Sequence, residues 1–430
     1  TSMKNSQLYH GEWWIPAEVH PDNYGIYPMV HKGMEARYTG TLTYHENEDT
    51  ILELYHVPSH FHSKQFAHNP VIWGRDANGH IFTLFNVWMR EQRLGDFSKT
   101  TFVVNMILVG EHVISMDDAH FSKCIVSFPY LRNWAFRSKL RIQDESDNYH
   151  YTLTDIYNEG FLIEQSVDKG IEWKLRDWYT LNFTRYELNI TQDTKFMIDA
   201  PKGISVRECL GQIGEFSQFL SIALYCEQNP SEVVFYTKDT NNKLELLFKK
   251  GESVTPAAVS LIKFDQLQSK IPSMLRTWHD NFDKVSPISG YLIDSLGKNS
   301  SFDVPDFLII AQALDGYHKR FVNKKDGRDV RQYKEQMEAL LKAFEEVDVI
   351  RNCKINSEVL TDSRNKYSHL YPDDEESKAV KGGRLYRLTE KCKILLTCCL
   401  LNMMGLTSEE INICCNQSPI DAMVNSLSFD

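Results

Sequence analysis

The sequence has no long hydrophobic run. None of its apolar stretches approaches the roughly eighteen residues that a membrane helix needs, so we expect no membrane-spanning segment in the 430 residues. No charged and then apolar segment follows Met3, which favours a cytoplasmic protein. The chain also lacks an internal repeat and a phosphate-cradling glycine loop of the GxxxxGKS/T or GxGxxG type. These absences argue against a P-loop enzyme, a dinucleotide-binding enzyme and a repeat protein.

Cysteine spacings that form disulfide frameworks or zinc knuckles are missing as well. The nine cysteines are odd in number and scattered, include vicinal pairs at 398–399 and 414–415, and show no CxxC spacing. We therefore expect buried thiols, no structural metal and no cofactor. A hydrophobic content of 42% and a charged content of 24% are those of an ordinary globular protein, long enough for two or three domains.

Positive charge is in deficit, with 47 Lys and Arg residues against 58 Asp and Glu residues and a net charge of −11. Cations nevertheless gather in two segments of the C-terminal third. The first holds Lys319, Arg320, Lys324, Lys325, Arg328, Arg331 and Lys334, and the second holds Lys378, Lys381, Arg384, Arg387, Lys391 and Lys393. Exposed charges farther apart than about 10 Å are screened at ordinary salt, so a polyanion responds to this local density. Each segment alone is equally compatible with a solvated helix face.

The N-terminal half has the pattern of β-structure. Residues 40–44, 50–57 and 71–88 alternate apolar and polar side chains around turn-forming residues, and 101–110, 172–191 and 195–199 continue the pattern. We predict a sandwich or barrel-like sheet assembly over residues 3–200. A mixed extension over 201–296 follows, with a helix at 205–225, a hairpin at 232–249 and helical runs at 256–282. The small, polar stretch 297–301 has the composition of a linker.

The remaining part, residues 297–430, predicts a helical bundle. Helical periodicity covers 304–323, 328–347, 357–370 and 383–404, and Thr407 with Glu410 opens a further short helix as a capping box. Short connections between such helices are typical of an antiparallel bundle. The predicted fold class is therefore α+β, with a β-rich N-terminal region and intervening helices followed by an all-α domain.

The segment 364–369, Arg-Asn-Lys-Tyr-Ser-His, carries the most specific chemistry. It pairs a permanent cation with the one side chain that exchanges protons near neutral pH, which is the minimum needed to cut RNA without a metal. Spacing alone is weak evidence. Residues 75–80 have the same Arg and His spacing, but there Asn78-Gly79 joins two β-type runs and predicts only a hairpin turn. The segment 364–369 differs because helical patterns flank it and Pro372 ends the helix just past His369.

These residues resemble a known family. The form Arg-Asn-x-x-x-His on a late helix of an all-α domain resembles the HEPN superfamily of ribonucleases, and the segments 307–320, 363–372 and 385–405 are similar to its ApeA-type members. The run Gly11-Glu12-Trp13-Trp14-Ile15-Pro16, followed by 40–44 and 52–54, resembles the β-rich domain that precedes HEPN in ApeA anti-phage proteins. The acid of the first bundle helix, usually Glu in the family, is Asp315 here.

The resemblance implies a metal-independent endoribonuclease in which a ribose 2′-OH attacks the adjacent phosphorus and leaves a 2′,3′-cyclic phosphate. Arg364 would stabilise the phosphoryl charge, Asn365 would bind the phosphate or orient a neighbour, and His369 would transfer the proton. Asp315 and His318 are accessory candidates. The predicted RNA contacts are Lys319, Arg320, Lys324, Lys325, Arg328, Arg331, Arg384, Arg387 and Lys391.

Helix geometry bears on the oligomeric state. Positions i and i+5 of an ideal helix lie about 140° apart, so Arg364 and His369 do not share one face. Either the helix frays near Pro372 or two protomers complete one site, and HEPN proteins usually pair their motifs across a dimer groove. The resemblance implies at least a homodimer that cleaves host RNA, with tRNA as a candidate, in abortive infection after a phage-derived trigger.

Two other functions stay open. A non-catalytic HEPN module would use a basic groove only to bind RNA or a partner, although such a module does not need a titrating histidine. A metallo-hydrolase would use His56, His60, His62 and His68, because His60 and His62 on one strand would point to the same face. No carboxylate or cysteine partner stands at a matching spacing, which disfavours the metal site.

Overall fold

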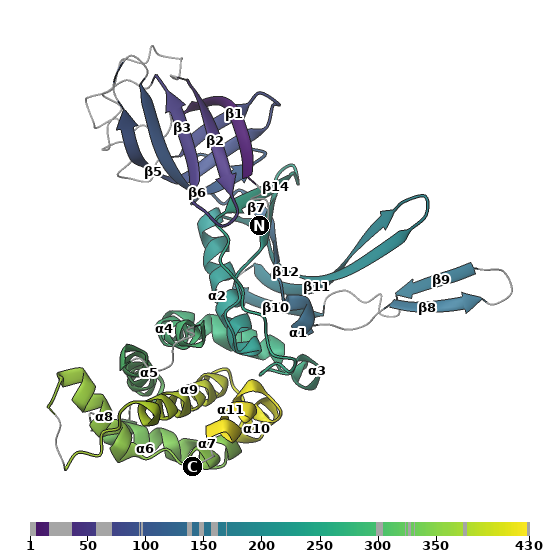
Figure 1. Cartoon of the computed structure of the whole chain (residues 1–430). Helices are drawn as coiled ribbons and strands as arrows, with labels where there is room; N and C mark the ends of the chain where they lie inside the picture. Colours follow the sequence, from purple (N-terminus) through teal and green to yellow (C-terminus); the bar gives the residue numbers. More distant parts are fainter. Residues whose placement is uncertain are drawn as a thin grey trace.

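The chain folds into a β-barrel, a second sheet and a helical bundle that follow one another along the molecule (Figure 1). The computed structural model describes residues 6–16, 37–56, 71–93, 95, 98–135, 140–145, 150–155, 162–168, 170–297, 304–322, 324–325, 328–330, 332–372 and 376–427. This arrangement confirms the predicted α+β class, and it shows that the N-terminal sheet assembly begins with a barrel.

Six strands close the barrel in the order β6-β3-β2-β1-β4-β5, with β5 pairing back onto β6. They are β1 (Ser6–Trp14), β2 (Tyr38–His45), β3 (Thr50–Tyr55), β4 (Ile72–Asp76), β5 (Ile81–Arg93) and β6 (Lys99–Val109). Alternation along these strands directs Trp13, Leu42 and Phe82 into a core that belongs to the barrel itself.

The turn between β4 and β5 is the hairpin predicted from Asn78-Gly79. Gly79 has φ +87°, a conformation that L side chains rarely adopt, and the Asp76 carboxylate accepts hydrogen bonds from the backbone N–H groups of Asn78 and His80. The His80 ring lies 2.7 Å from Asp76, as part of the same turn. The prediction that residues 75–80 form a hairpin turn is therefore confirmed.

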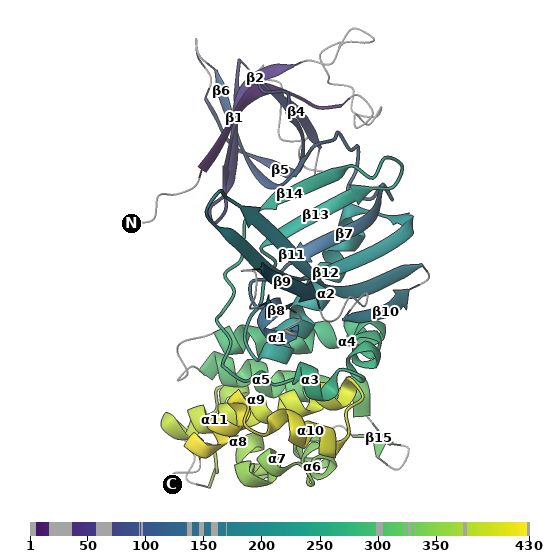
Figure 2. The ribbon, with the colours of Figure 1, turned by 90° about the vertical axis from the view of Figure 1, so that its right-hand side faces the viewer.

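The second sheet has the order β10-β11-β12-β7-β13-β14, and its last strand, β14, pairs with β6 of the barrel. Its strands are β7 (Phe121–Ser127), β10 (Ile163–Asp168), β11 (Ile171–Phe183), β12 (Leu188–Ile204), β13 (Glu232–Thr237) and β14 (Lys243–Phe248), and β8 (Leu140–Glu145) pairs separately with β9 (His150–Asp155). Helix α2 (Val206–Leu224) covers one face, which carries Val126 and Phe196. The opposite face carries Ile125 and Lys195 and is turned toward the viewer in Figure 2.

Helix α2 matches its prediction closely because local signals fix both ends. The Ser205 and Glu208 side chains form a reciprocal capping box, and Tyr225 ends the helix in the left-handed conformation. The predicted hairpin at 232–249 is confirmed as β13 and β14.

The helical part differs from its prediction in two places. Helix α4 (Ile271–Gly297) continues beyond the predicted end at 282, and a short hairpin interrupts the helices near 324–329. Its elements are α1 (Leu131–Ala135), α3 (Phe264–Leu267), α4 (Ile271–Gly297), α5 (Val304–Tyr317), the π-helical turn η2 (His318–Val322), α6 (Tyr333–Ala343), α7 (Asp348–Cys353), α8 (Ser357–His369), α9 (Gly383–Met403), α10 (Ser408–Cys415) and α11 (Pro419–Leu427). The predicted helix over 328–347 is partly wrong, because β15 (Lys324–Lys325) and β16 (Arg328–Asp329) form a small hairpin before α6. The capping box at Thr407 is confirmed.

One continuous hydrophobic core joins the second sheet to the helical bundle. It contains Phe196 from the sheet, Phe216 from α2, Trp278 from α4 and Leu395 from α9. Helix α4 is the connecting element, since it packs against α2 and β10 and also against α5 and α9. The core thus continues past the predicted boundary near 297, and residues 298–301 of that linker lie outside the described residues.

A partly buried ion pair between α2 and α4 makes this junction sensitive to pH. The His279 Nδ1 atom lies 2.8 Å from the Glu215 carboxylate, and this hydrogen bond raises the pKa of His279 above its usual value. A raised folded-state pKa stabilises the protein fully below the unfolded pKa, and the contribution disappears as the pH rises through the folded value. We expect His279→Gln to lower the free energy of unfolding by about 1–2 kcal/mol at pH 5.5 and by much less at pH 8.5.

Urea titrations of both proteins at the two pH values measure this difference. A loss that is equal at pH 5.5 and pH 8.5 would contradict a contribution from the charged imidazole.

Candidate active site and RNA interface

Helix α8 carries the Arg-Asn-x-x-x-His segment and is regular throughout. The Asn356 side chain caps its N-terminus by accepting from the backbone of Glu358 and Val359, and Leu370 ends it in the left-handed conformation. The explanation that the helix frays near Pro372 is therefore wrong, because α-helical geometry continues through His369. The angle of about 140° between positions five residues apart applies to Arg364 and His369 in one chain.

Arg364 is held against α6 at the inner side of α8. Its guanidinium carbon lies 5.3 Å from the centre of the Tyr333 ring, and its Nη1 donates to the side-chain oxygen of Asn365 at 3.1 Å. The Tyr333 hydroxyl donates to the backbone oxygen of Ala311 on α5 at 3.2 Å. A cation over an aromatic face is stabilised and oriented by it, so the guanidinium is preorganised before any substrate binds.

Asp315 reaches the same place from the end of α5. Burial raises the pKa of Tyr333 well above its usual range, and the Asp315 carboxylate adds to this while Arg364 opposes it. The two charges therefore both act on the Tyr333 ring. Asp315 also forms an ion pair with Lys319 at 2.8 Å, one turn farther along the chain. The predicted accessory acid Asp315 and the predicted catalytic cation Arg364 are thus both close enough to Tyr333 to affect its pKa.

His369 is the last residue of α8 and its side chain is exposed. Its ring is 5.3 Å from that of Tyr371, and among the described residues no hydrogen-bond partner holds either ring nitrogen. The next residue, Leu370, is 86% exposed and has φ 55°, a conformation that costs a bulky residue of order 1 kcal/mol. An unpaired imidazole and two exposed apolar side chains at one helix end are typical of a surface that another molecule covers.

His318 does not share a surface with Asp315. The side chain is 1% exposed in the π-helical turn η2, and both ring nitrogens lack a hydrogen-bond partner among the described residues. Burial lowers the pKa of His318 below its usual value, which keeps the ring neutral. This geometry argues against the prediction that His318 reaches an RNA groove, because helix periodicity predicts a side-chain direction but not what packs over it.

The first cationic segment is only partly described. Lys319 and Arg320 are exposed, and Arg320 donates to the backbone oxygen of Lys284 on α4. The side chains of Lys324, Lys325 and Arg328, and the whole of Arg331, lie outside the described residues. Their contact with RNA therefore stays a prediction.

The second cationic segment is split by the structure into three environments. Arg384, Arg387 and Lys391 lie along one side of α9 and line a cleft of about 230 Å³ together with Lys354. The other lining residues, Ile355, Asn356, Val359, Val380 and Leu388, include no acid. A cleft with four cations and no lining carboxylate favours an anionic ligand. Val359 and Arg364 are also five residues apart on α8, so the cleft faces a different side of that helix from Arg364.

Lys378 and Lys393 have other roles. Lys378 forms an ion pair with Glu358 at the start of α8. The Lys393 side chain is 6% exposed and its ammonium group lies 3.3 Å from Asp306 and 2.8 Å from Glu390. The interpretation of Lys393 as part of an exposed phosphate-attracting face is wrong, because this lysine neutralises two buried carboxylates.

Neither comparison with single proteins identifies a relative: no curated protein and no solved structure matches the chain. Two family models do match. Residues 8–278 match the ApeA N-terminal domain 1, and residues 308–410 match the Apea-like HEPN domain. The chain belongs to the ApeA-type HEPN proteins. HEPN domains form a ribonuclease superfamily typical of defence systems, and the Arg364 to His369 segment lies inside the matched HEPN region of this ApeA-type chain.

The metal site of the alternative function falls mostly outside the residues that the structure describes. His56 lies in the described part, whereas His60, His62 and His68 fall outside it. No cluster of three potential metal ligands occurs among the residues whose placement is described. Within the same part of the chain, no helix is long and apolar enough to cross a membrane.

Two residues of the candidate site were not identified from the sequence. Tyr333 supports Arg364, and Lys354 completes the cationic cleft. Neither carries a local signal, since each is an ordinary helix-end residue until α6, α7, α8 and α9 pack together.

Proposed function

We propose that this ApeA-type HEPN protein is a metal-independent endoribonuclease that cleaves host RNA, with tRNA as a candidate, in abortive anti-phage defence. The observation that supports this most directly is the preorganised Arg364, which stacks on Tyr333 and donates to Asn365. His369 lies on the same helix and has no hydrogen-bond partner within the described part of the chain. A cytoplasmic location and a phage-derived trigger belong to the same proposal.

In the proposed reaction a ribose 2′-oxygen attacks the adjacent phosphorus and the bond to the 5′-oxygen breaks. His369 accepts the 2′-hydroxyl proton or donates a proton to the departing 5′-oxygen. Arg364 holds two phosphoryl oxygens with its planar fork as negative charge builds up. Because the Asn365 side-chain oxygen accepts from Arg364, its NH₂ group can donate to the phosphate.

Metal removal tests the reaction class. We expect cleavage to continue in EDTA at the untreated rate, because Arg364 supplies the positive charge that a metal would bring. The products should carry 2′,3′-cyclic phosphate and 5′-hydroxyl ends, which mass spectrometry of short RNA products identifies. Strict dependence on Mg²⁺, or 3′-hydroxyl products, would assign the cleavage to a different mechanism.

Two chains are required by the proposed site. In one chain about 140° separates Arg364 from His369, and Leu370 and Tyr371 expose apolar surface beside His369 that a second copy would bury. Both motifs of a dimer then form one groove. In an equimolar mixture of wild-type and His369→Ala chains, half of the dimers are heterodimers, and the single groove of each is damaged. We expect activity well below half of that of wild type at the same total concentration, measured by RNA cleavage.

A linear fall to one half would mean that chains act independently. Full activity of a protein that light scattering shows to be monomeric at the assay concentration would also contradict a shared site.

The rival function, an RNA- or partner-binding HEPN module without catalysis, is favoured by one observation. The cleft lined by Lys354, Arg384, Arg387 and Lys391 faces away from Arg364, so it can bind an anion independently of the motif. Such a module would bind RNA with steep salt dependence and would leave the RNA intact.

A further inference from the structure

The face of the second sheet opposite α2 contains a cleft of about 360 Å³. Five adjacent strands, β11, β12, β7, β13 and β14, form its floor, and Arg132 of α1 reaches its edge. The volume lies in the range of small-molecule sites. The lining residues that matter for binding are Arg132, Trp178, Thr180, Thr191, Tyr236 and Lys243.

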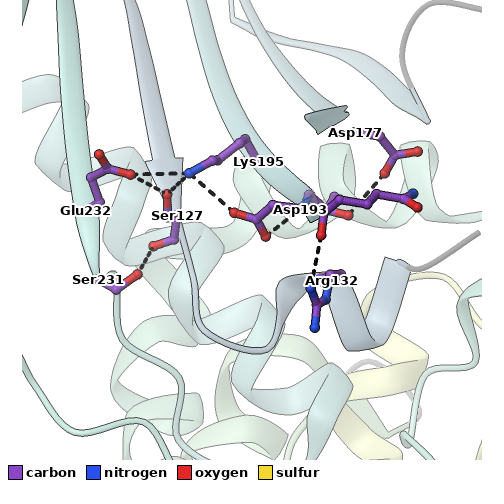
Figure 3. Close-up of polar contacts among 9 residues, drawn as sticks. Ser127, Arg132, Asp177, Asp193, Lys195, Ser231 and Glu232 are labelled. Atoms are coloured by element: carbon purple, nitrogen blue, oxygen red, sulfur yellow. Dashed lines mark hydrogen bonds and ion pairs between the residues drawn. The ribbon is translucent and has the colours of Figure 1, made fainter. Parts of the chain in front are cut away.

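The lysine at the centre of the floor, Lys195, is fully paired. Lys195 contacts the Ser127 hydroxyl, Glu232 at 3.2 Å and Asp193 at 3.3 Å, so its three N–H donors all have partners (Figure 3). Burial acts to raise the pKa of Glu232, but the hydrogen bond from Ser127 and the charge of Lys195 outweigh it and lower that pKa. Lys195 is thus shared between two carboxylates, and the charge of Lys243 also contributes to lowering the pKa of Glu232.

The lining of the cleft holds three cations, Arg132, Lys195 and Lys243, and two acids, Asp193 and Glu232, so positive charge is in excess by one. Among the residues that the structure describes, none forms a hydrogen bond or ion pair with the Lys243 ammonium group. Arg132 is held by a bond from Nη1 to the backbone oxygen of Gln192 at 3.0 Å, which leaves most of its fork available (Figure 3). An anionic ligand would pair with both groups and balance the excess positive charge of the lining.

Each flank of the cleft also presents an aromatic ring. Trp178 on β11 is 38% exposed although it lines a concave surface, and it stands in register with Asp193. Tyr236 on β13 stands in register with Lys243. Thr180 and Thr191 stand in register with each other, two residues from Trp178 and Asp193 respectively. Exposed aromatic side chains on a sheet face, next to cations, are a platform on which bases stack.

From these observations we propose that this cleft binds a ligand of nucleotide chemistry, with the base against Trp178 and a phosphate against Arg132 or Lys243. The ligand is either a free nucleotide or a nucleotide within a single strand. The site lies on the second sheet, away from α8, so it is separate from the proposed cleavage site.

Calorimetric titration of the full chain tests this. The chain carries Arg364→Ala, so that added RNA is not cut. The probes are AMP, GMP, CMP and UMP, a short single-stranded oligoribonucleotide, the corresponding nucleosides and inorganic phosphate. We expect at least one mononucleotide or the oligonucleotide to bind, and Trp178→Ala to weaken that binding at least about tenfold. Lys243→Glu should weaken it as well.

Matched variants keep the test decisive. Trp178→Phe retains a ring and should bind within about threefold of the parent, since stacking tolerates a smaller aromatic. Trp88→Ala removes another exposed tryptophan, 45% exposed on β5 of the barrel, and should change nothing. Binding of mononucleotides points to a free nucleotide, and binding of the oligonucleotide alone points to a strand.

The proposal is overturned if no nucleotide or oligonucleotide binds, if inorganic phosphate binds as tightly as the nucleotides, or if Trp178→Ala and Lys243→Glu bind like the parent. RNA cleavage by the unmodified chain is measured separately, so failure here leaves the proposed ribonuclease function standing.

Discussion

His369→Ala is expected to lose at least about 10²-fold in RNA cleavage while keeping the wild-type melting temperature. The ring is exposed at the end of α8 and touches only Tyr371 among the described residues, so its removal deletes a proton-transfer group without opening a cavity. Initial cleavage rates and thermal unfolding by circular dichroism, measured on the same preparations, check both parts of the expectation.

The chain supplies its own control. His80 has the same spacing from an arginine as His369, but it belongs to the β4–β5 turn in the barrel. His80→Ala should cleave at the wild-type rate. A His369→Ala variant that is folded and still cleaves like wild type would remove the proton-transfer role.

Arg364→Ala should lose cleavage to a similar extent, although the change also removes the stacking contact with Tyr333. Arg364→Lys separates the two contributions. It keeps the positive charge and loses the planar fork, so a catalytic role for the fork predicts that Lys does not restore the rate.

Lys393→Ala is expected to lower the free energy of unfolding by about 3–5 kcal/mol. The ammonium group is the cation between Asp306, which is 3% exposed at the side chain, and Glu390, and Asp306 also accepts from the Ser295 hydroxyl of α4 at 2.6 Å. Removing it leaves two carboxylates with no cation in the α4, α5 and α9 junction. Urea unfolding at pH 7 measures the loss.

Two further variants make this result specific. Lys391→Ala, two residues earlier on α9, removes a cation of the cleft and should change stability by less than about 0.5 kcal/mol while weakening RNA binding. A variant carrying Asp306→Asn, Glu390→Gln and Lys393→Met together should recover most of the lost stability, since buried charges replaced as a set cost little. A Lys393→Ala protein as stable as wild type would contradict the buried network.

Predictions that rest on local rules agree with the structure. The Asn78-Gly79 turn, the capped helix α2, helix α8 and the capping box at Thr407 each depend on a few residues that are neighbours in sequence. The prediction for the middle of the helical part was less accurate, because the hairpin of β15 and β16 interrupts a stretch whose periodicity favours a helix. Local signals fix where an element begins and ends when the caps are strong.

The sequence by itself determined the α+β class, the ends of the capped helices, and the Arg364 and His369 pair as the candidate chemistry. Tertiary structure alone decided which charged and polar side chains are available to a ligand. Lys391 and Lys393 are two residues apart on α9, yet the first lines a cationic cleft and the second is buried between two acids. The physical reason is that burial and ion pairing depend on residues brought together from α4, α5, α7 and α9, and the sequence around a lysine does not contain them.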